Sequence, residues 1–401
     1  MSKPEIRLKG FEGEWETGLF STYAKPYFVS NKFVHHQNLL SLSYGKIVQK
    51  DITANKGLLP ASFDTYQIVK KGIIVFRFTD LQNDHKSLRV GIAKEEGIIS
   101  PAYVCIECDN IDSDFFYLQM HTYDMRKKFY SMGDGMRQTL SYNDVKDMPL
   151  YIPSLPEQKA IVEYFNVLEK EITTETENLT KLRQMKSASL ISMFPQNGES
   201  KPRVRFKEFE GEWESVPLSQ FSKKVTKKNL NLEYRITLTN SAEYGIINQL
   251  DFFDHEISNG DNIRGYYIVE NDDFVYNPRI SVSAPVGPIN RNLLGYAGVM
   301  SPLYYVFKVF GIDKDYLSVF FKTKLWHKFM KDNGNSGARF DRLSITDDVF
   351  VQMPILYPSN PKEQQKIASF FTNLDKQISL QEQRLEKLKQ IKAACLDKMF
   401  V

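Results

Sequence analysis

Residues 154–165 read SLPEQKAIVEYF, and residues 360–371 read NPKEQQKIASFF. The two stretches share Glu, Gln, Ile and Phe at equivalent positions, and the similarity continues without a gap as far as Phe194 and Phe400. Similarity of this length, at a constant offset within one chain, indicates an internal duplication. The duplication predicts two halves that are built on a common frame.

Each copy predicts the start of a long helix. Ser154 and Glu157 have the spacing of a capping box, and so do Asn360 and Glu363. After the first turn, neither segment contains Gly or Pro until its last residues. Because these are the two residues that most often end a helix, we expect each helix to run through the whole repeat.

Apolar residues within each predicted helix follow alternating spacings of four and three, which is the heptad pattern of a coiled coil. Polar residues interrupt both patterns at equivalent positions, Glu175 with Gln381 and Lys186 with Lys392. Since polar seam residues fix register and partner, we favour pairing of the two helices with each other over packing of each helix on its own domain. The predicted seam residues are Leu168, Ile172, Leu179, Leu182, Leu374, Ile378, Leu385 and Leu388.

A shorter repeat precedes each half. Residues 11–16 and 209–214 both read FEGEWE. Between each hexapeptide and the next predicted helix, the chain has little internal similarity but many short β-type runs, such as SPAYVCIEC and SPLYYVFKVF. We interpret Trp15 and Trp213 as packing anchors that open each domain.

The sequence therefore predicts a fold of the α+β class, with two globular domains of mixed, β-rich α/β structure, two long repeated helices and a pseudo-twofold internal repeat. The predicted boundaries are a first domain at 1–153, a helical spacer at 154–195, a linker at 196–206, a second domain at 207–358 and a second helical spacer at 359–401.

Composition and cysteine usage exclude several classes of protein. No apolar run approaches the ~18 residues of a membrane helix. The N-terminus, MSKPEIRLKG, has no apolar signal core, and we expect a cytoplasmic protein. Cys105 and Cys108 form a lone CxxC motif without the second ligand pair of a structural zinc site, so we interpret them as ordinary strand cysteines.

Catalytic motifs are missing from the sequence. It contains no GxxxxGK[ST] phosphate loop, no HExxH and no GxSxG, and no GxGxxG follows a predicted strand. Residues 277–280 share only Asn-Pro with the tetrapeptide of adenine methyltransferases and are better explained as a turn. We predict that this chain is not an enzyme by itself and binds neither metal nor cofactor.

Local basic clusters favour nucleic acid more than the formal net charge of +3 does. Arg reads guanine and Asn or Gln reads adenine, whereas Lys more often neutralises phosphate. The alternative for any one of these residues is a solvated surface charge. The candidate DNA-binding residues are Lys25, His35, His36, Gln37, Asn38, Tyr44, Lys46, Arg77, Arg89, Arg137 and Gln138 in the first half, and Lys223, Lys224, Lys227, Lys228, Arg235, Arg264, Tyr266, Arg279, Asn290, Arg291, Asn292, Arg339 and Arg342 in the second.

The complete pattern resembles the specificity (S) subunit of type I restriction-modification systems. The resemblance is carried by the two FEGEWE copies, by the Glu-Gln helix starts at 157–158 and 363–364, and by the leucine seams that end at Phe194 and Phe400. It spans the whole chain, and its motifs are specific in combination rather than singly.

The resemblance implies a DNA-reading chain without catalysis. In this family, each variable domain is a target-recognition domain that reads one half of a bipartite, asymmetric site in double-stranded DNA. The repeated helices form an antiparallel pair that spaces the domains and docks two methyltransferase (M) subunits, which carry S-adenosylmethionine and methylate adenine. Two restriction (R) subunits add translocation and cleavage that depend on ATP and magnesium. The resemblance carries over no base-contacting residue, because recognition domains vary.

Two alternatives stay open at this level. The chain could be a coiled-coil scaffold whose two β-rich domains bind proteins. A nuclease or methyltransferase with degenerate motifs is a remoter alternative, because the sequence lacks the catalytic motifs named above.

Overall fold

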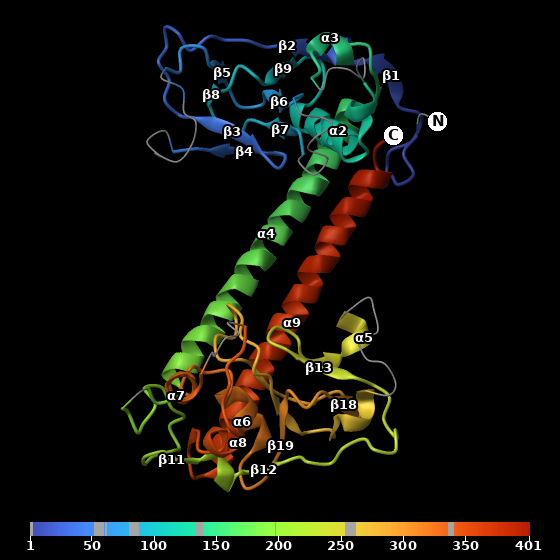
Figure 1. The fold of residues 1–401 in the computed structure, drawn as a ribbon. Coiled ribbons are helices and arrows are strands. Elements are labelled where there is room, and N and C mark those ends of the chain that lie inside the picture. Colours follow the sequence, from blue (N-terminus) through green and yellow to red (C-terminus); the bar gives the residue numbers. More distant parts are fainter. Residues whose placement is uncertain are drawn as a thin grey trace. The chain divides into compact units, whose positions relative to one another are not determined.

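The structure is a computed structural model of the chain. It describes residues 3–51, 60, 62–79, 88–132, 139–196, 198–252, 262–335 and 341–401. The chain divides into two compact units, which are Met1–Glu177 with Gln383–Val401, and Asn178–Glu382 (Figure 1). Because both boundaries fall within long helices, each unit combines one variable domain with a part of each helix.

The first unit carries a variable domain of short strands and helices. Its elements are β1 (Glu16–Leu19), α1 (Phe20–Tyr23), β2 (Ala24–Pro26), β3 (Leu40–Ser43), β4 (Lys46–Gln49), β5 (Gln67–Val69), β6 (Ile74–Phe76), β7 (Val90–Ile92), β8 (Gly97–Ile99), β9 (Val104–Cys108), α2 (Ser113–Met125), η1 (Lys128–Ser131), α3 (Tyr142–Val145) and β10 (Pro149–Ile152).

The variable domain of the second unit is built in the same way. Its elements are β11 (Glu214–Pro217), η2 (Leu218–Gln220), β12 (Ser222–Lys224), β13 (Leu238–Ser241), β14 (Gly245–Asn248), α5 (Gln249–Phe252), η3 (Asn262–Gly265), β15 (Tyr267–Val269), β16 (Phe274–Tyr276), β17 (Ile289–Arg291), β18 (Gly298–Met300), β19 (Tyr305–Val309), α6 (Lys314–Phe320), α7 (His327–Asn333), α8 (Asp347–Phe350) and β20 (Pro354–Tyr357).

The two domains share one antiparallel topology. The first has a four-stranded sheet in the order β2-β9-β6-β7 and the pairs β1-β10, β3-β4 and β5-β8; the second has β12-β19-β16-β17 with β11-β20, β13-β14 and β15-β18. The central strands β6 (IVF) and β16 (FVY) are buried at every position although their sequences differ. A core needs apolar side chains of suitable volume rather than particular residues, so the topology outlasts the sequence similarity. The predicted α+β class is confirmed.

Two long helices, α4 (Leu155–Ser192) and α9 (Pro361–Lys398), follow the variable domains. In the first unit the start of α4 lies beside the end of α9, and in the second unit the end of α4 lies beside the start of α9 (Figure 1). The pair is therefore antiparallel within each unit. Of the predicted seam residues, four are buried and four are half-buried; the buried ones are Leu168, Leu179, Leu374 and Leu385, and the others are Ile172, Leu182, Ile378 and Leu388.

The polar residues of the seam form ion pairs between the helices. Lys186 lies 2.5 Å from Asp375 in the second unit. Lys392, which occupies the equivalent position in the first unit, pairs with Glu169. The buried Glu175 lies 2.9 Å from Arg384. Since these cations meet carboxylates at defined positions along the partner helix, the pairs help to fix the register.

An arginine joins the first FEGEWE copy to the start of α4. Arg7 Nε and Nη2 donate to the two carboxylate oxygens of Glu157, both at 2.7 Å. The same guanidinium donates to the carbonyls of Glu12 and Gly13. Trp15 Nε1 donates to the same carboxylate at 3.3 Å. The acidic hexapeptide is therefore the partner of an arginine within its own unit.

The second unit repeats this arginine clasp. Arg205 Nε and Nη2 donate to the carboxylate of Glu363, both at 2.8 Å, and the guanidinium also donates to the carbonyls of Glu210 and Gly211. Gly211 has a φ of 88°, and its counterpart in the first copy has 86°, a conformation that favours glycine. Glycine in FEGEWE thus allows the turn that presents its carbonyls to the arginine.

The capping-box prediction is wrong for both glutamates, because arginine binds each carboxylate. Asn360 nevertheless caps α9, since its Oδ1 accepts from the N–H of Lys362 at 3.0 Å. The neighbouring glutamines make a further link: Gln158 Oε1 accepts from the N–H of Asp112 and Gln364 Oε1 from that of Asp313, both at 2.9 Å. The two aspartates are the N-caps of α2 and α6. The Glu-Gln motif therefore ties each long helix to its domain.

The end of one helix completes the core of each unit. Phe400, just after α9, packs in the first unit against Phe115 and Phe165, with ring centroids 5.6 and 6.2 Å away. Phe194, just after α4, packs in the second unit against Trp213 at 5.6 Å and Tyr316 at 5.8 Å. Each variable domain thus needs a segment that lies outside it in the sequence.

Cys105 and Cys108 lie on β9, as the sequence predicts. Burial raises the pKa of each thiol to about 12. Among the described residues, no helix is both long and apolar enough to cross a membrane.

We expect Arg205→Ala to lower the free energy of unfolding of the second unit by about 3 kcal/mol, because it leaves the buried carboxylate of Glu363 unpaired. Arg203→Ala is the matched control, since its partner Glu199 is exposed and such pairs contribute under about 1 kcal/mol. Hydrogen exchange measured peptide by peptide reports each unit separately. Equal effects of the two substitutions would contradict a structural role for the clasp.

We expect Phe400→Ala to destabilise the first unit and Phe194→Ala the second, each by about 3–5 kcal/mol, since each removes a buried aromatic ring. The same exchange experiment checks both variants, and each serves as the control for the other. Loss of protection in the opposite unit alone would show that the helix ends do not complete these cores.

Candidate DNA interface

Each variable domain carries a β-hairpin whose loop presents an exposed tyrosine. In the first, the loop between β3 and β4 is Tyr44-Gly45, with φ values of 47° and 76°, and the Tyr44 side chain is 74% exposed. Positive φ at both loop residues is the signature of a type I′ turn. In the second, Tyr244 is 61% exposed and precedes Gly245, which has a φ of 72°. Both hairpins therefore present a tyrosine in the loop, Tyr44 directly after β3 and Tyr244 directly before β14.

A second exposed feature is a loop that a buried asparagine holds at its base. Asn31 Oδ1 accepts from the N–H of His36 at 2.7 Å, and its Nδ2 donates to the carbonyl of His36 at 3.3 Å. Asn229 makes the same two bonds with Tyr234, at 3.1 and 2.7 Å. The first loop displays Phe33, which is 85% exposed. The second displays Leu230, also exposed, so the two domains present different side chains from one kind of loop.

In the second domain, the fold brings together three predicted residues that are distant in the sequence. Tyr266, Arg279 and Arg342 line one cavity of about 560 Å³. Arg279 and Arg342 face each other in an antiparallel bridge. Thr237 and Gln249 add hydrogen-bonding groups to the walls. The site combines cations, an aromatic ring and neutral polar groups, which are the side chains that contact bases and phosphates.

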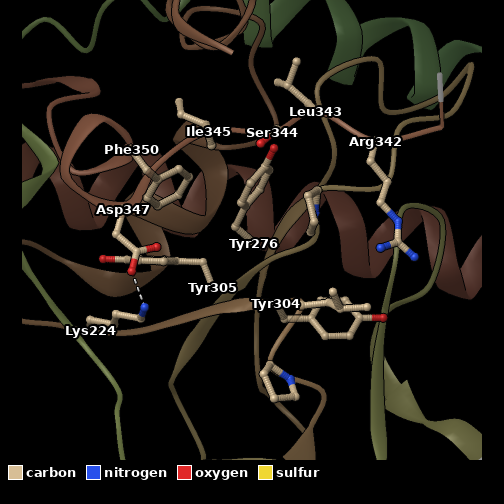
Figure 2. A pocket seen from close by; sticks show the side chains of 13 residues that line it. Lys224, Tyr276, Tyr304, Tyr305, Arg342, Leu343, Ser344, Ile345, Asp347 and Phe350 are labelled. Atoms are coloured by element: carbon tan, nitrogen blue, oxygen red, sulfur yellow. Dashed lines mark hydrogen bonds and ion pairs between the residues drawn. The ribbon is translucent and has the colours of Figure 1, made fainter. Parts of the chain in front are cut away.

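A neighbouring cavity of about 380 Å³ shares Arg342 and Tyr304 with the first. Figure 2 shows these two residues at one end and the ion pair of Lys224 with Asp347 at the other. Tyr305 lies beside this ion pair, and its pKa is raised to about 12, mainly by burial. The Lys224 ammonium lies 5.3 Å from the centre of the Tyr305 ring. The predicted cation Lys224 is thus partly neutralised inside the domain.

Four of the candidate residues make contacts within their own domain. Arg89 is fully buried, and its Nε donates to the hydroxyl of Tyr130 at 3.0 Å. On and just after β17, Asn290 and Asn292 are buried, and Arg291 lies between them. Asn290 Nδ2 donates to Oδ1 of Asn240, and Asn292 Nδ2 donates to the carbonyl of Glu270. Arg291 forms ion pairs with the carboxylates of Asp272 and Asp315. The buried amide groups of Asn290 and Asn292 thus donate within the domain, as burial of a polar group requires.

The remaining candidates lie at or near the surface. The exposed ones are Lys25, His35, Gln37, Tyr44, Lys46, Lys223, Lys227, Lys228, Arg235, Arg264 and Arg279, and the half-buried ones are His36, Asn38, Arg77, Lys224, Tyr266 and Arg342. Arg137, Gln138 and Arg339 lie outside the described residues.

Three aromatic residues that are exposed or line a cavity are not among the residues predicted from the sequence. Tyr244 could have been found from the Tyr-Gly dipeptide that repeats at 44–45 and 244–245. Phe33 and Tyr304 carried no such signal, because only the folded loop and the cavity reveal their exposure. Within the described ranges, no group of three or more His, Cys, Asp or Glu residues could hold a metal ion.

Three solved structures are similar to this chain over nearly its whole length. One comes from a study of complex assembly and conformational transition of the type I R-M system (15% identity, 96% of this chain and 97% of that chain, TM-score 0.52). The second is the HsdS subunit from Thermoanaerobacter tengcongensis (15% identity, 96% of each chain, TM-score 0.51). The third is a type I restriction-modification S subunit from M. genitalium (13% identity, 100% and 99%, TM-score 0.56). At these identities the likeness shows a shared fold.

No curated protein is detectably similar to this chain. The sequence does, however, match one family model in two places. The model for the type I restriction modification DNA specificity domain matches residues 44–184 and 210–390, which include most of both variable domains and of both long helices. The chain therefore belongs to the type I restriction-modification DNA specificity family.

Proposed function

We propose that this chain is the sequence-specificity subunit of a type I restriction-modification complex, and that each variable domain reads one half of a bipartite, asymmetric DNA site. The observation that carries the proposal is one antiparallel frame that occurs twice with different exposed side chains. The loop held by Asn31 presents Phe33, whereas the loop held by Asn229 presents Leu230. Two domains that share a topology but expose different side chains suit the recognition of two different half-sites.

The DNA-contacting groups on this proposal are the exposed candidates. Lys25 and Lys46 in the first domain, and Lys223, Lys227 and Lys228 in the second, would neutralise phosphates. Tyr44 and Tyr244, which are exposed in the loops of the two hairpins, would add an aromatic contact in each half-site. Side chains that differ between the domains would carry the sequence preference.

The long helices would space the domains and dock two M subunits. A duplicated frame offers two equivalent surfaces, which suits two identical partners. Met185 on α4 and Ile391 on α9 are equivalent in the repeat, and both are exposed apolar side chains. Exposed apolar residues at repeated positions on a helix favour a protein interface there.

On this proposal, the M and R subunits catalyse the methylation and cleavage reactions. The M subunits would bring S-adenosylmethionine and methylate adenine, and two R subunits, joined through the M subunits, would add ATP- and magnesium-dependent cleavage. This chain would supply DNA binding and orientation without catalysing a step itself.

Exchange of residues 20–148 for those of a related chain should change only one half of the methylated motif, because the exchange keeps β1, β10 and the arginine clasp. The measurement is N6-methyladenine mapping after co-expression with the M subunit. The reciprocal exchange in the second domain is the control and should change the other half. A change in both halves, or in neither, would contradict independent reading.

We expect Met185→Glu and Ile391→Glu each to leave one M subunit bound, and the double variant to bind none, since each places a charge in one apolar interface. Native mass spectrometry gives the stoichiometry. Val167→Glu is the matched control, because Val167 is also exposed on α4 but its repeat equivalent is the polar Asn373. Two M subunits bound to every variant would exclude this surface.

Methylation mapping with the same co-expressed complex also distinguishes the proposed specificity subunit from the alternative function, a coiled-coil scaffold that binds proteins. A scaffold would leave genomic methylation without a bipartite motif, whereas a specificity subunit would confer one.

A further inference from the structure

Two arginines in the second domain face each other across a short antiparallel ladder. The N–H of Ile280 donates to the carbonyl of Asp341 at 3.0 Å, and the N–H of Leu343 donates to the carbonyl of Pro278 at 2.9 Å. These backbone bonds place Arg279 opposite Arg342. Like charges directly opposite on neighbouring strands destabilise a fold. The pair is therefore an unfavourable feature that the fold itself does not need.

The pair is weakly neutralised in comparison with the structural arginines. Arg279 Nε and Arg342 Nε each lie 3.9 Å from the same oxygen, Oδ2 of Asp341. By contrast, Arg205 forms a two-pronged bond to its own carboxylate at 2.8 Å, and Arg291 lies within 3.1 Å of one of its two carboxylates. Two guanidinium groups that share one distant carboxylate leave a net positive charge at the mouth of the cavity.

The cavity that the two arginines line also contains aromatic rings and hydroxyl groups. Tyr266 and Tyr304 contribute aromatic rings, and the Tyr304 hydroxyl lies 3.2 Å from Oγ1 of Thr239. Arg342 lines both this cavity of about 560 Å³ and its aromatic neighbour, where Figure 2 shows it at the same end as Tyr304. Arginines, hydroxyls and aromatic rings together suit the edge of a base.

We propose that Arg279 and Arg342 read guanine in the half-site of the second domain, and that Asp341 is a positioning residue for both. This inference rests on the proposed function and names the residues and the base. A guanidinium fork donates two hydrogen bonds to O6 and N7 of guanine. The shared carboxylate favours a base over a phosphate, because it reduces the charge of the pair and so weakens the attraction for an anion, whereas hydrogen bonds to the neutral edge of a base depend less on that charge.

The test uses Arg279→Lys and Arg342→Lys in the full complex with the M subunit. Lysine keeps the charge but loses the planar fork. Methylation is measured on DNA duplexes in which each base pair of the second domain's half-site is randomised. That half-site is the half of the motif that stays unchanged when residues 20–148 of the first domain are exchanged. Each variant should lose about 5- to 150-fold discrimination for guanine at one position, the range that a bidentate contact provides. The other half-site should be unchanged.

Arg203→Lys is the matched control, since Arg203 is exposed in the same unit, is not among the candidate DNA-binding residues and lines neither cavity, and it should leave the motif intact. A wild-type half-site without guanine on either strand would overturn the inference while the proposed function stands. Unchanged discrimination with uniformly weaker binding would also overturn it, because that result indicates phosphate contact. Wild-type methylation without any bipartite motif would remove the proposed function and the inference together.

A stability measurement separates reading from a structural role. Arg279→Gln removes one of two facing like charges, so the variant should melt at or above the wild-type temperature while it loses guanine discrimination. A lower melting temperature would identify Arg279 as a residue that stabilises the fold, and would overturn the proposal for it.

Discussion

The arginine clasp is the interaction on which both units depend. Arg7 and Arg205 each bind a glutamate at the start of a long helix together with two carbonyls of FEGEWE. The carboxylates are almost fully buried, so each is stabilised only while its arginine is in place. The clasp thereby fixes the first turn of the helix against the segment that opens the domain. The hexapeptide, which is conspicuous for its charge, has a structural role.

Around the clasp, each unit closes with chain from elsewhere in the sequence. The first unit is completed by Phe400, and the second by Phe194. The N–H of Ile6 donates to the carbonyl of Lys398 at 3.0 Å, and in the second unit the N–H of Val204 donates to the carbonyl of Ser192 at 2.9 Å. In the first unit this hydrogen bond joins the N-terminal and C-terminal segments of the chain. In the second unit the equivalent bond joins two ends of one continuous segment, residues 192–204. This repetition explains why the helix ends are similar: both perform the same packing.

Residues of one type have three different roles in this chain, and only their surroundings distinguish them. Arg205 holds a helix start, Arg89 lies in the core, and Arg279 faces another arginine at a cavity. In sequence, each is a basic residue among polar and aromatic neighbours. The difference lies in long-range contacts, such as the 158 positions that separate Arg205 from its glutamate. No local pattern encodes partners at that distance.

The sequence by itself determined the duplication, the two long helices, the α+β class and the family, because these depend on periodic or repeated residues that can be compared directly. Only the tertiary structure decided that the unlike domains share one topology, that Arg89 and Asn292 are buried, and that Arg279 meets Arg342. Burial and pairing arise from contacts between segments far apart in the chain, and those contacts exist only once the chain is folded.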